Sequence, residues 1–405
     1  MEKVNYIERT WAEIDLDKMI ESCRVIREEM VPAGTQLMAV LKADAYGHGA
    51  RYLAPVLEKE GGVSWFAVAC LSEAIDLRLG GVKSPILVLG LTDVQYAGLL
   101  SKYQITQTLG SLDYAKALNE AAKKTGVRID GHIKVNTGMN RLGFGSGKES
   151  SETIAAEILE VSKMSFLTIS GMYSHLYDSL TYDEHTHEKC YRQYLQFKTI
   201  RDLLKARGFE VPLCHLCNTG GTINYPELAM DMVRVGSLLW GLKGVSPGAM
   251  QRWQPALQPV FQLKTKIAMI RNICAGESVG YSSNYIAQKK MTIAIVSCGY
   301  ADGFSRKNSN RGFMLVKGKR APVIGNVCMD MTMLDITEIK DAAVGDIVTV
   351  FGKDGHEEIS CGEAAIYADT IEPEITTVIS RRVPRVYYRN HHIIHIQDYL
   401  LPELR

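Results

Sequence analysis

The sequence predicts an α/β protein made of an N-terminal (β/α)8 TIM-like barrel followed by a C-terminal, mainly β domain. Three observations predict this fold class. Short apolar runs of β-forming residues alternate with longer amphipathic segments over the first 240 residues. Eight such runs occur, which is the number of strands in a closed parallel barrel. After about residue 245, Gly and Pro turn signals separate short strand-like runs.

The expected elements follow from these runs in chain order. Barrel strands are predicted at 37–42, 65–71, 85–90, 105–110, 131–138, 167–176, 211–218 and 231–240. Helices are predicted between them at 72–79, 112–124, 150–164 and 187–206. Strands of the second domain are predicted at 262–270, 291–297, 312–316, 322–327, 347–351 and 383–388.

The segment 9–16 alternates like a strand before the first helix, so we expect it to cross over to the second domain's sheet. The chain therefore divides into residues 1–16, which join the C-terminal domain, residues 17–245, which form the barrel, and residues 246–405, which form the β domain.

The composition excludes several function classes. The chain has 405 residues, and 46 Lys and Arg against 45 Asp and Glu give a net charge of +1. This balance gives no electrostatic basis for binding nucleic acid or an anionic membrane. The first residues lack a basic segment leading into an apolar one, and no apolar run approaches the roughly 18 residues of a membrane span. We expect a soluble cytoplasmic protein with a small-molecule partner.

Nine cysteines without framework spacing predict reduced thiols. Cys214 and Cys217 have the spacing of a redox or zinc pair, but no second pair completes a structural zinc site. Two histidine groups, at 185 and 187 and at 391, 392 and 395, also lack a full ligand set. No metal is expected.

Chemical groups gather at the ends of the predicted barrel strands. Lys42 follows the first run, in a tight glycine-containing turn where an amine can lose part of its hydration and its pKa can fall. After the seventh and eighth runs, hydroxyls and backbone N–H groups that could hold a phosphate come from Asn218, Thr219, Gly236 and Ser237. A single lysine could be an ordinary strand residue, and a single glycine could simply serve a tight turn. The combination of these residues suggests pyridoxal 5′-phosphate.

Several segments resemble, in order, motifs of the alanine racemases, which are fold-type III pyridoxal-phosphate enzymes. The resemblance extends from about residue 9 to residue 390. The segments that carry it are 39–49, 134–143, 231–236, 279–281, 299–303, 325–330 and 382–385.

The resemblance implies a racemase that interconverts L- and D-alanine by two-base proton transfer at Cα and supplies D-alanine for peptidoglycan. Lys42 would hold the cofactor as a Schiff base and act on one face. Tyr281 of a partner subunit would act on the other, so a homodimer is implied. A phenol is normally protonated near neutral pH, and His175 would hydrogen-bond and orient it. Arg234 would face the pyridine nitrogen.

Further residues receive roles by the same resemblance. Arg141 would approach the cofactor's phenolic oxygen and bind the substrate carboxylate. Lys134 corresponds to a lysine that many relatives carry in carbamylated form. Tyr46 and Thr219 would contact the phosphate. Tyr300, Met329 and Asp330 would belong to the substrate entrance of the neighbouring subunit, with Asp330 supporting the loop.

Three positions depart from the family pattern. Asn136 replaces an acidic residue, Trp240 replaces a tyrosine, and Pro373 replaces a tyrosine near the phosphate. Because proline offers neither a phenol nor a backbone N–H, the pocket could admit a larger side chain. The residues after His175 also resemble the serine racemases of vancomycin resistance. Serine, or mixed alanine and serine use, is therefore the alternative substrate.

Two other function classes remain open. A fold-type III amino-acid decarboxylase would share the barrel, but Arg234 argues against it because decarboxylation benefits from a carboxylate at the ring nitrogen. A non-catalytic pyridoxal-phosphate-binding protein could manage with the barrel alone, so the second domain and Tyr281 favour an enzyme.

Overall fold

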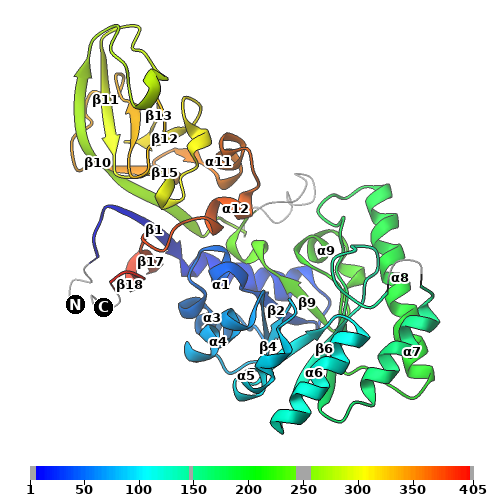
Figure 1. Ribbon diagram of the computed structural model, residues 1–405. Helices are drawn as coiled ribbons and strands as arrows, with labels where there is room; N and C mark the ends of the chain where they lie inside the picture. Colours follow the sequence, from blue (N-terminus) through cyan, green and yellow to red (C-terminus); the bar gives the residue numbers. More distant parts are fainter. Residues whose placement is uncertain (1–5, 146–148, 243–256, 402–405) are drawn as a thin grey trace.

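A closed barrel of eight parallel strands forms the first part of the chain (Figure 1). The computed structural model describes residues 6–145, 149–242 and 257–401. All eight predicted apolar runs contribute one strand each, so the predicted barrel is confirmed. The strands are β2 Gln36–Val40, β3 Trp65–Val68, β4 Ile86–Val88, β5 Ile105–Leu109, β6 Ile129–Lys134, β7 Leu167–Tyr173, β8 Cys214–His215 and β9 Met232–Val235.

Helices surround the barrel, and the longer ones bury one apolar face each. In the helix that begins at Leu112, Ala115, Leu118 and Ala122 are buried, which is the spacing of one helical face. Side-chain caps begin several helices, because Asp15, Ser111, Ser150 and Asp183 accept a bond from an N–H in the first turn. The helices are α1 Leu16–Val25, α3 Ala50–Glu60, α4 Leu71–Leu79, α5 Ala97–Lys102, α6 Leu112–Thr125, α7 Ser151–Ser162, α8 Glu184–Ala206 and α9 Thr219–Asn224.

The second part is rich in β-structure and extends away from one side of the barrel (Figure 1). Its main path runs in the order β13-β12-β15-β10-β1-β17-β18, with β11, β14 and β16 attached to it. The strands are β10 Phe261–Ile273, β11 Met291–Val296, β12 Phe313–Val316, β13 Lys319–Pro322, β14 Thr332–Asp335, β15 Ile347–Asp354, β16 Glu357–Ile359, β17 Arg385–Arg389 and β18 His392–Gln397. Two helices, α11 Cys361–Ala368 and α12 Glu372–Thr377, complete it.

The strand at the start of the chain, β1 (Thr10–Asp15), lies in this second sheet. It pairs antiparallel with β10 and parallel with β17. The chain then enters the barrel through α1, so the two parts share a covalent and hydrogen-bonded junction. The boundary expected at residues 245 and 246 lies outside the described residues.

One predicted strand of the second domain is displaced. The apolar run 322–327 was expected to be a strand, but β13 ends at Pro322. β13 instead pairs with β12 across a two-residue turn, where Lys317 and Gly318 both have positive φ. Beyond β13, only Val323 continues the pairing, through a single antiparallel bridge to Leu334 of β14. Ile324 and Val327 are buried in the loop that follows, so their apolar character reflects burial rather than a continued strand.

No helix in the described part of the chain is long and apolar enough to cross a membrane.

Candidate active site

A cavity of about 480 Å³ lies at the C-terminal ends of the barrel strands. Active sites of such barrels are built at this face by the loops that follow the strands. The cavity brings together residues that the sequence placed at five different strand ends. They are Lys42, Tyr46, Lys134, Arg141, His175, Asn218, Thr219, Arg234, Gly236 and Ser237.

Lys42 opens a turn with left-handed backbone geometry, labelled α2 (Lys42–Tyr46). The four residues from Ala43 to Tyr46 have φ between 52° and 56°. For residues other than glycine this conformation costs about 1–2 kcal/mol each. The turn therefore requires contacts from surrounding elements, and these contacts decide where Lys42 lies.

Both parts of the chain supply such contacts. Arg385 of β17 donates from Nε to the Gly47 carbonyl at 2.9 Å, and the Tyr387 hydroxyl donates to the His48 carbonyl at 2.9 Å. The Asp44 carboxylate accepts from the Ala50 N–H at 2.8 Å and from the hydroxyl of Tyr399. The second domain thus holds the turn that carries the barrel's reactive amine.

The Lys42 amine is partly buried, and its environment favours the neutral form. Burial, and after it the charge of Arg141, lowers the pKa of Lys42 from its ordinary value, while Glu73 acts in the opposite direction. The amine lies 6.0 Å from the centre of the Tyr46 ring. A neutral amine can act as a nucleophile or as a base, so the cavity contains a usable reactive group.

The other end of the cavity is closely packed around Tyr46 and Gly236. A Cβ at Gly236 would lie 2.3 Å from the Tyr46 hydroxyl oxygen, so only glycine allows this approach. The Gly236 N–H donates to the Thr219 hydroxyl at 3.2 Å, which joins the loops after β8 and β9. Hydroxyls and backbone amides therefore converge where the sequence predicted a phosphate site.

Arg234 is buried on the floor of the cavity, and burial lowers its pKa to about 10, so it remains a cation near neutral pH. One terminal nitrogen donates to His215 Nδ1 at 2.9 Å and to the His215 carbonyl at 3.1 Å. The other donates to the carbonyls of Ser174, at 2.7 Å, and Leu216, at 3.0 Å, and also lies 3.3 Å from His175 Nδ1. These bonds within the described chain use both terminal nitrogens and leave Nε–H for the cavity.

The arginine also fixes the proton of His215. Because a guanidinium donates and cannot accept, Nδ1 of His215 is the acceptor and Nε2 carries the proton. Donors approach both ring nitrogens of His175, Arg234 at Nδ1 and the Asn218 amide at Nε2, each at 3.3 Å. Burial, and after it the positive charge of Arg234, holds the pKa of both histidines well below 6.5. His215 can then donate to His132 Nδ1 at 3.0 Å.

This role of His215 was not predicted from the sequence. The spacing of Cys214 and Cys217 drew attention to a redox or zinc pair that was not favoured, whereas the more useful signal was the histidine between them, inside a buried strand. Burial raises the pKa of both flanking thiols to about 12. Within the described ranges, no three His, Cys, Asp or Glu side chains lie close enough together to hold a metal ion.

Lys134 at the end of β6 is a buried amine beside two arginines. Burial, followed by Arg234 and Arg141, lowers its pKa well below the ordinary value. Its Nζ lies 4.9 Å from the centre of the Tyr173 ring. Asn136 does not serve as its counter-charge; its amide bonds to Asn140 and other groups of its own loop.

Four of the predicted residues lie in the second domain and do not line the cavity of their own chain. Tyr281 begins a 3-10 turn, Tyr281–Ser283, and is 71% exposed. Met329 and Tyr300 are also exposed, and Asp330 forms an ion pair with Arg382 at 2.7 Å.

The remaining departures from the family pattern have defined places. Trp240 is fully buried and stacks on His48, with ring centres 4.4 Å apart, so it packs behind the turn that follows Lys42. Pro373 lies in the first turn of α12, where proline fits without losing a helical hydrogen bond.

Comparisons with known proteins agree with this geometry. Residues 14–244 match the alanine racemase N-terminal domain family, and residues 260–387 match the alanine racemase C-terminal domain family. An alanine racemase of Clostridium acetobutylicum is 35% identical over 98% of this chain and 99% of its own length. The solved alanine racemase of Clostridium difficile superposes with a TM-score of 0.89, at 35% identity, over 98% of this chain and 100% of its own.

A third relative has a cofactor in its structure. The alanine racemase of Bartonella henselae, solved with covalently bound pyridoxal phosphate, has a TM-score of 0.80 and 26% identity over 94% of this chain and 99% of its own. Family matches that together span both parts of the chain, and full-length relatives above 30% identity, show one conclusion: the chain belongs to the alanine racemase family.

Proposed function

We propose that this chain interconverts L- and D-alanine in the cavity above the barrel, with pyridoxal 5′-phosphate attached at Lys42. One observation carries the proposal: a partly buried amine with a lowered pKa, Lys42, and a buried guanidinium, Arg234, line one cavity in a member of the alanine racemase family. The D-alanine product would serve peptidoglycan synthesis.

The residues of the cavity fit this cofactor. The neutral amine of Lys42 can form the covalent link. The hydroxyls of Tyr46, Thr219 and Ser237, with backbone N–H groups of the loops after β8 and β9, would hold the phosphate. The close approach of the Tyr46 hydroxyl to Gly236 is an arrangement that a larger residue at 236 would prevent. Arg234 would direct its Nε–H at the ring nitrogen.

When bound, the cofactor supplies an electron-withdrawing ring that acidifies the Cα hydrogen of the substrate. Lys42 accepts or returns this proton at Nζ on one face. Its lowered pKa enlarges the neutral fraction that can act as a base near neutral pH. Arg141 binds the substrate carboxylate through its fork of donors and so keeps Cα next to Lys42.

The second proton carrier is Tyr281 of a partner subunit, which makes the enzyme a homodimer with shared sites. Tyr281 is 71% exposed and does not line its own cavity, which supports a function in another copy of the chain. Met329 and Tyr300 are exposed apolar side chains of the same domain and would lie at the partner's substrate entrance. His175 would hydrogen-bond to the Tyr281 oxygen and orient it.

Arg234 also distinguishes racemisation from decarboxylation. A guanidinium cannot give the ring nitrogen the full proton that a carboxylate partner would stabilise, so electron withdrawal into the ring is limited. Limited withdrawal of electrons into the ring favours the return of a proton to Cα over other reactions of the bound substrate. Release of carbon dioxide from alanine or serine by the purified protein would overturn this assignment.

We further propose that Lys134 is carbamylated. Its neutral Nζ forms a bond to the carbon of carbon dioxide and releases a proton, which places a negative carbamate beside Arg141 and Arg234. The lowered pKa of this buried amine supports the reaction. A carbamate resonance from ¹³C-bicarbonate is expected in the wild-type protein and not in Lys134→Ala; the same resonance in both would contradict the assignment.

Serine is the second candidate substrate, and Pro373 is the observation that favours it. A proline at the first turn of α12 replaces the phenol that the family pattern has near the phosphate, and so removes a hydrogen-bond donor. One hydroxyl in a pocket changes discrimination by only about 1–3 kcal/mol, so both substrates need to be measured side by side.

The experiment is a racemisation assay of the purified protein with pyridoxal 5′-phosphate and either L-alanine or L-serine. We expect D-alanine to form, and we expect Lys42→Ala to lose both this activity and the visible absorption of the bound cofactor. Lys123→Ala, on the exposed face of α6, is the matched control and should keep both. Failure of the wild-type protein to racemise either amino acid would refute the proposed function.

A further inference from the structure

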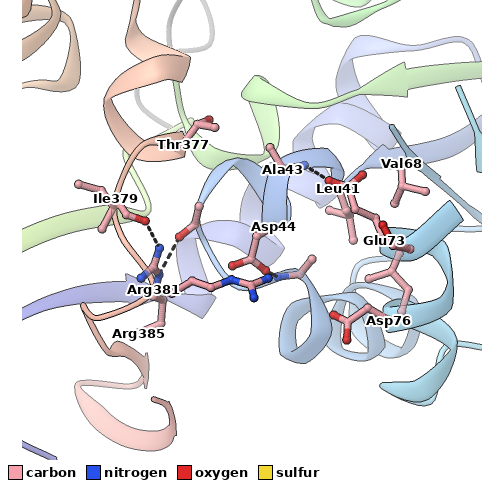
Figure 2. Close-up of a pocket in the computed structure, with 14 residues that line it drawn as sticks. Leu41, Ala43, Asp44, Val68, Glu73, Asp76, Thr377, Ile379, Arg381 and Arg385 are labelled. Atoms are coloured by element: carbon pink, nitrogen blue, oxygen red, sulfur yellow. Dashed lines mark hydrogen bonds between the residues drawn. The ribbon is translucent and has the colours of Figure 1, made fainter. Parts of the chain in front are cut away.

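Glu73 of α4 lies outside the cofactor cavity but contacts the turn that carries Lys42. Its Oε1 accepts from the Ala43 N–H at 2.7 Å (Figure 2). Its Oε2 accepts from the Ala69 N–H at 2.7 Å. Ala43 directly follows Lys42, and Ala69 directly follows β3. One carboxylate therefore ties the loops after two neighbouring barrel strands.

This contact lies at the end of the turn nearest to the amine. The left-handed residues cannot form a regular helix with the chain before them, and the first N–H groups of any short turn need acceptors from elsewhere. Elsewhere in the turn, the Asp44 carboxylate accepts from Ala50 and Tyr399, and Arg385 binds the Gly47 carbonyl at its far end. Glu73 holds the near end, so its loss would release the backbone immediately after Lys42.

We propose that Glu73 is a positioning residue that fixes Lys42 in the cofactor cavity by holding the left-handed turn against the end of β3. The inference rests on the proposed function of Lys42 as the cofactor-binding, proton-carrying amine. Glu73 touches neither substrate nor cofactor in this account and acts only through the backbone and charge of the turn.

Charge gives this role a measurable signature. Glu73 raises the pKa of Lys42, against the lowering by burial and by Arg141. The other groups that face this amine are Tyr46, whose ring centre is 6.0 Å away, and His175, which is neutral because its own pKa is lowered. Removal of the Glu73 charge should therefore lower the pKa of Lys42 further.

The chain offers a matched control on the same helix. Asp76 lies three residues after Glu73 and lines the same cavity of about 490 Å³ behind the turn (Figure 2). Its carboxylate pairs with Arg51 at 3.2 Å rather than with the turn. Asp76→Asn removes an equal charge from the same cavity without breaking the bonds to Ala43 and Ala69.

The first experiment measures racemisation by the complete enzyme. Glu73→Gln keeps the size of the side chain but loses the charge and one acceptor, and it should lower kcat by about 10–100-fold, as expected for a reactive group displaced by a fraction of an ångström to 1 Å. KM for alanine should change by less than about threefold, because Arg141 still binds the carboxylate. Asp76→Asn should match the wild-type protein in both constants.

The second experiment does not depend on racemisation. In the cofactor-free protein, the rate at which pyridoxal 5′-phosphate is captured at Lys42 is read from its visible absorption. The pH at which Lys42 is half modified by reductive methylation is read by mass spectrometry. Glu73→Gln should slow capture by about tenfold or more and move the methylation midpoint to lower pH.

The Glu73→Asp variant distinguishes the effect of side-chain length from the effect of charge. It keeps the carboxylate but is one methylene shorter, so it should slow capture while it leaves the methylation midpoint near that of the wild-type protein. A Glu73→Gln protein that equals the wild type in capture rate or in methylation midpoint would overturn the proposal. A wild-type protein that captures the cofactor at Lys42 but racemises no amino acid would instead overturn the proposed function, because capture still reports the position of Lys42.

Discussion

Replacement of Gly236 by alanine tests the close packing at the expected phosphate end of the cavity. The new Cβ would lie 2.3 Å from the Tyr46 hydroxyl oxygen and 2.9 Å from the ring carbon that bears it, whereas ordinary contacts lie at 3.4–4 Å. Tyr46 must therefore move by about 1 Å or more, away from the loops after β8 and β9.

Two magnitudes follow from this displacement. Overpacking of a closely fitted site costs about 1–3 kcal/mol, and we expect the free energy of unfolding to fall by that amount. Displacement of the Tyr46 hydroxyl also removes a hydrogen bond to the charged phosphate, which contributes about 1.5–3 kcal/mol, so the Kd for pyridoxal 5′-phosphate should rise about 10–150-fold. Absorbance titration and urea unfolding measure the two effects separately.

The control is Gly98→Ala, within α5, where a Cβ would meet no atom within 4 Å. Alanine is favoured over glycine in a helix, so this variant should be slightly more stable and should bind the cofactor normally. A Gly236→Ala protein with wild-type Kd would refute the reasoning, because it would show that the contact between Tyr46 and residue 236 does not shape the site.

Two further predictions concern stability. His48 and His132 are buried and their pKa is lowered from 6.5 to about 3, so the unfolded chain binds more protons between these values. As the pH is lowered from 6.5, the free energy of unfolding should therefore decrease by about 1.4 kcal/mol per pH unit for each histidine. Equal urea midpoints at pH 7.5 and 5.5 would contradict this prediction. Tyr399→Phe removes the bond to the Asp44 carboxylate and should cost about 1.5–3 kcal/mol in urea unfolding. No loss would show that Tyr399 does not support the turn.

Much of the barrel was predictable because burial on both faces makes its strands apolar throughout. The runs that became β2 to β9 were identified from their composition and from the helical segments between them. Composition was less reliable in the second domain. The buried run after Pro322 was expected to be a strand. The short polar strand β13 forms just before it instead, because the hairpin turn at Lys317 and Gly318 pairs it with β12. The predicted strand positions did not take this turn into account.

The residues of the candidate site could be predicted from the sequence, but the backbone conformation that positions them could not. Lys42 was found because chemical groups at strand ends share one face of a barrel, and Arg234 was found because residues 231–236 resemble a motif of the family. The left-handed turn could not be anticipated, since the residues from Ala43 to Tyr46 carry no propensity for it. Its conformation depends on Glu73 of α4 and Arg385 of β17, which are distant in sequence and whose contacts exist only in the folded chain.

In the proposed mechanism, Lys42 of one subunit and Tyr281 of the other act on the same substrate. The most direct test is a hybrid dimer of one Lys42→Ala chain and one Tyr281→Phe chain, purified through two different tags. Shared sites give this hybrid one intact site out of two, and hence about half of wild-type activity, although both parent dimers are impaired. The hybrid of Lys42→Ala with the wild-type chain, which should also have about half, checks the assay; a double-variant hybrid no more active than its parents would contradict the account.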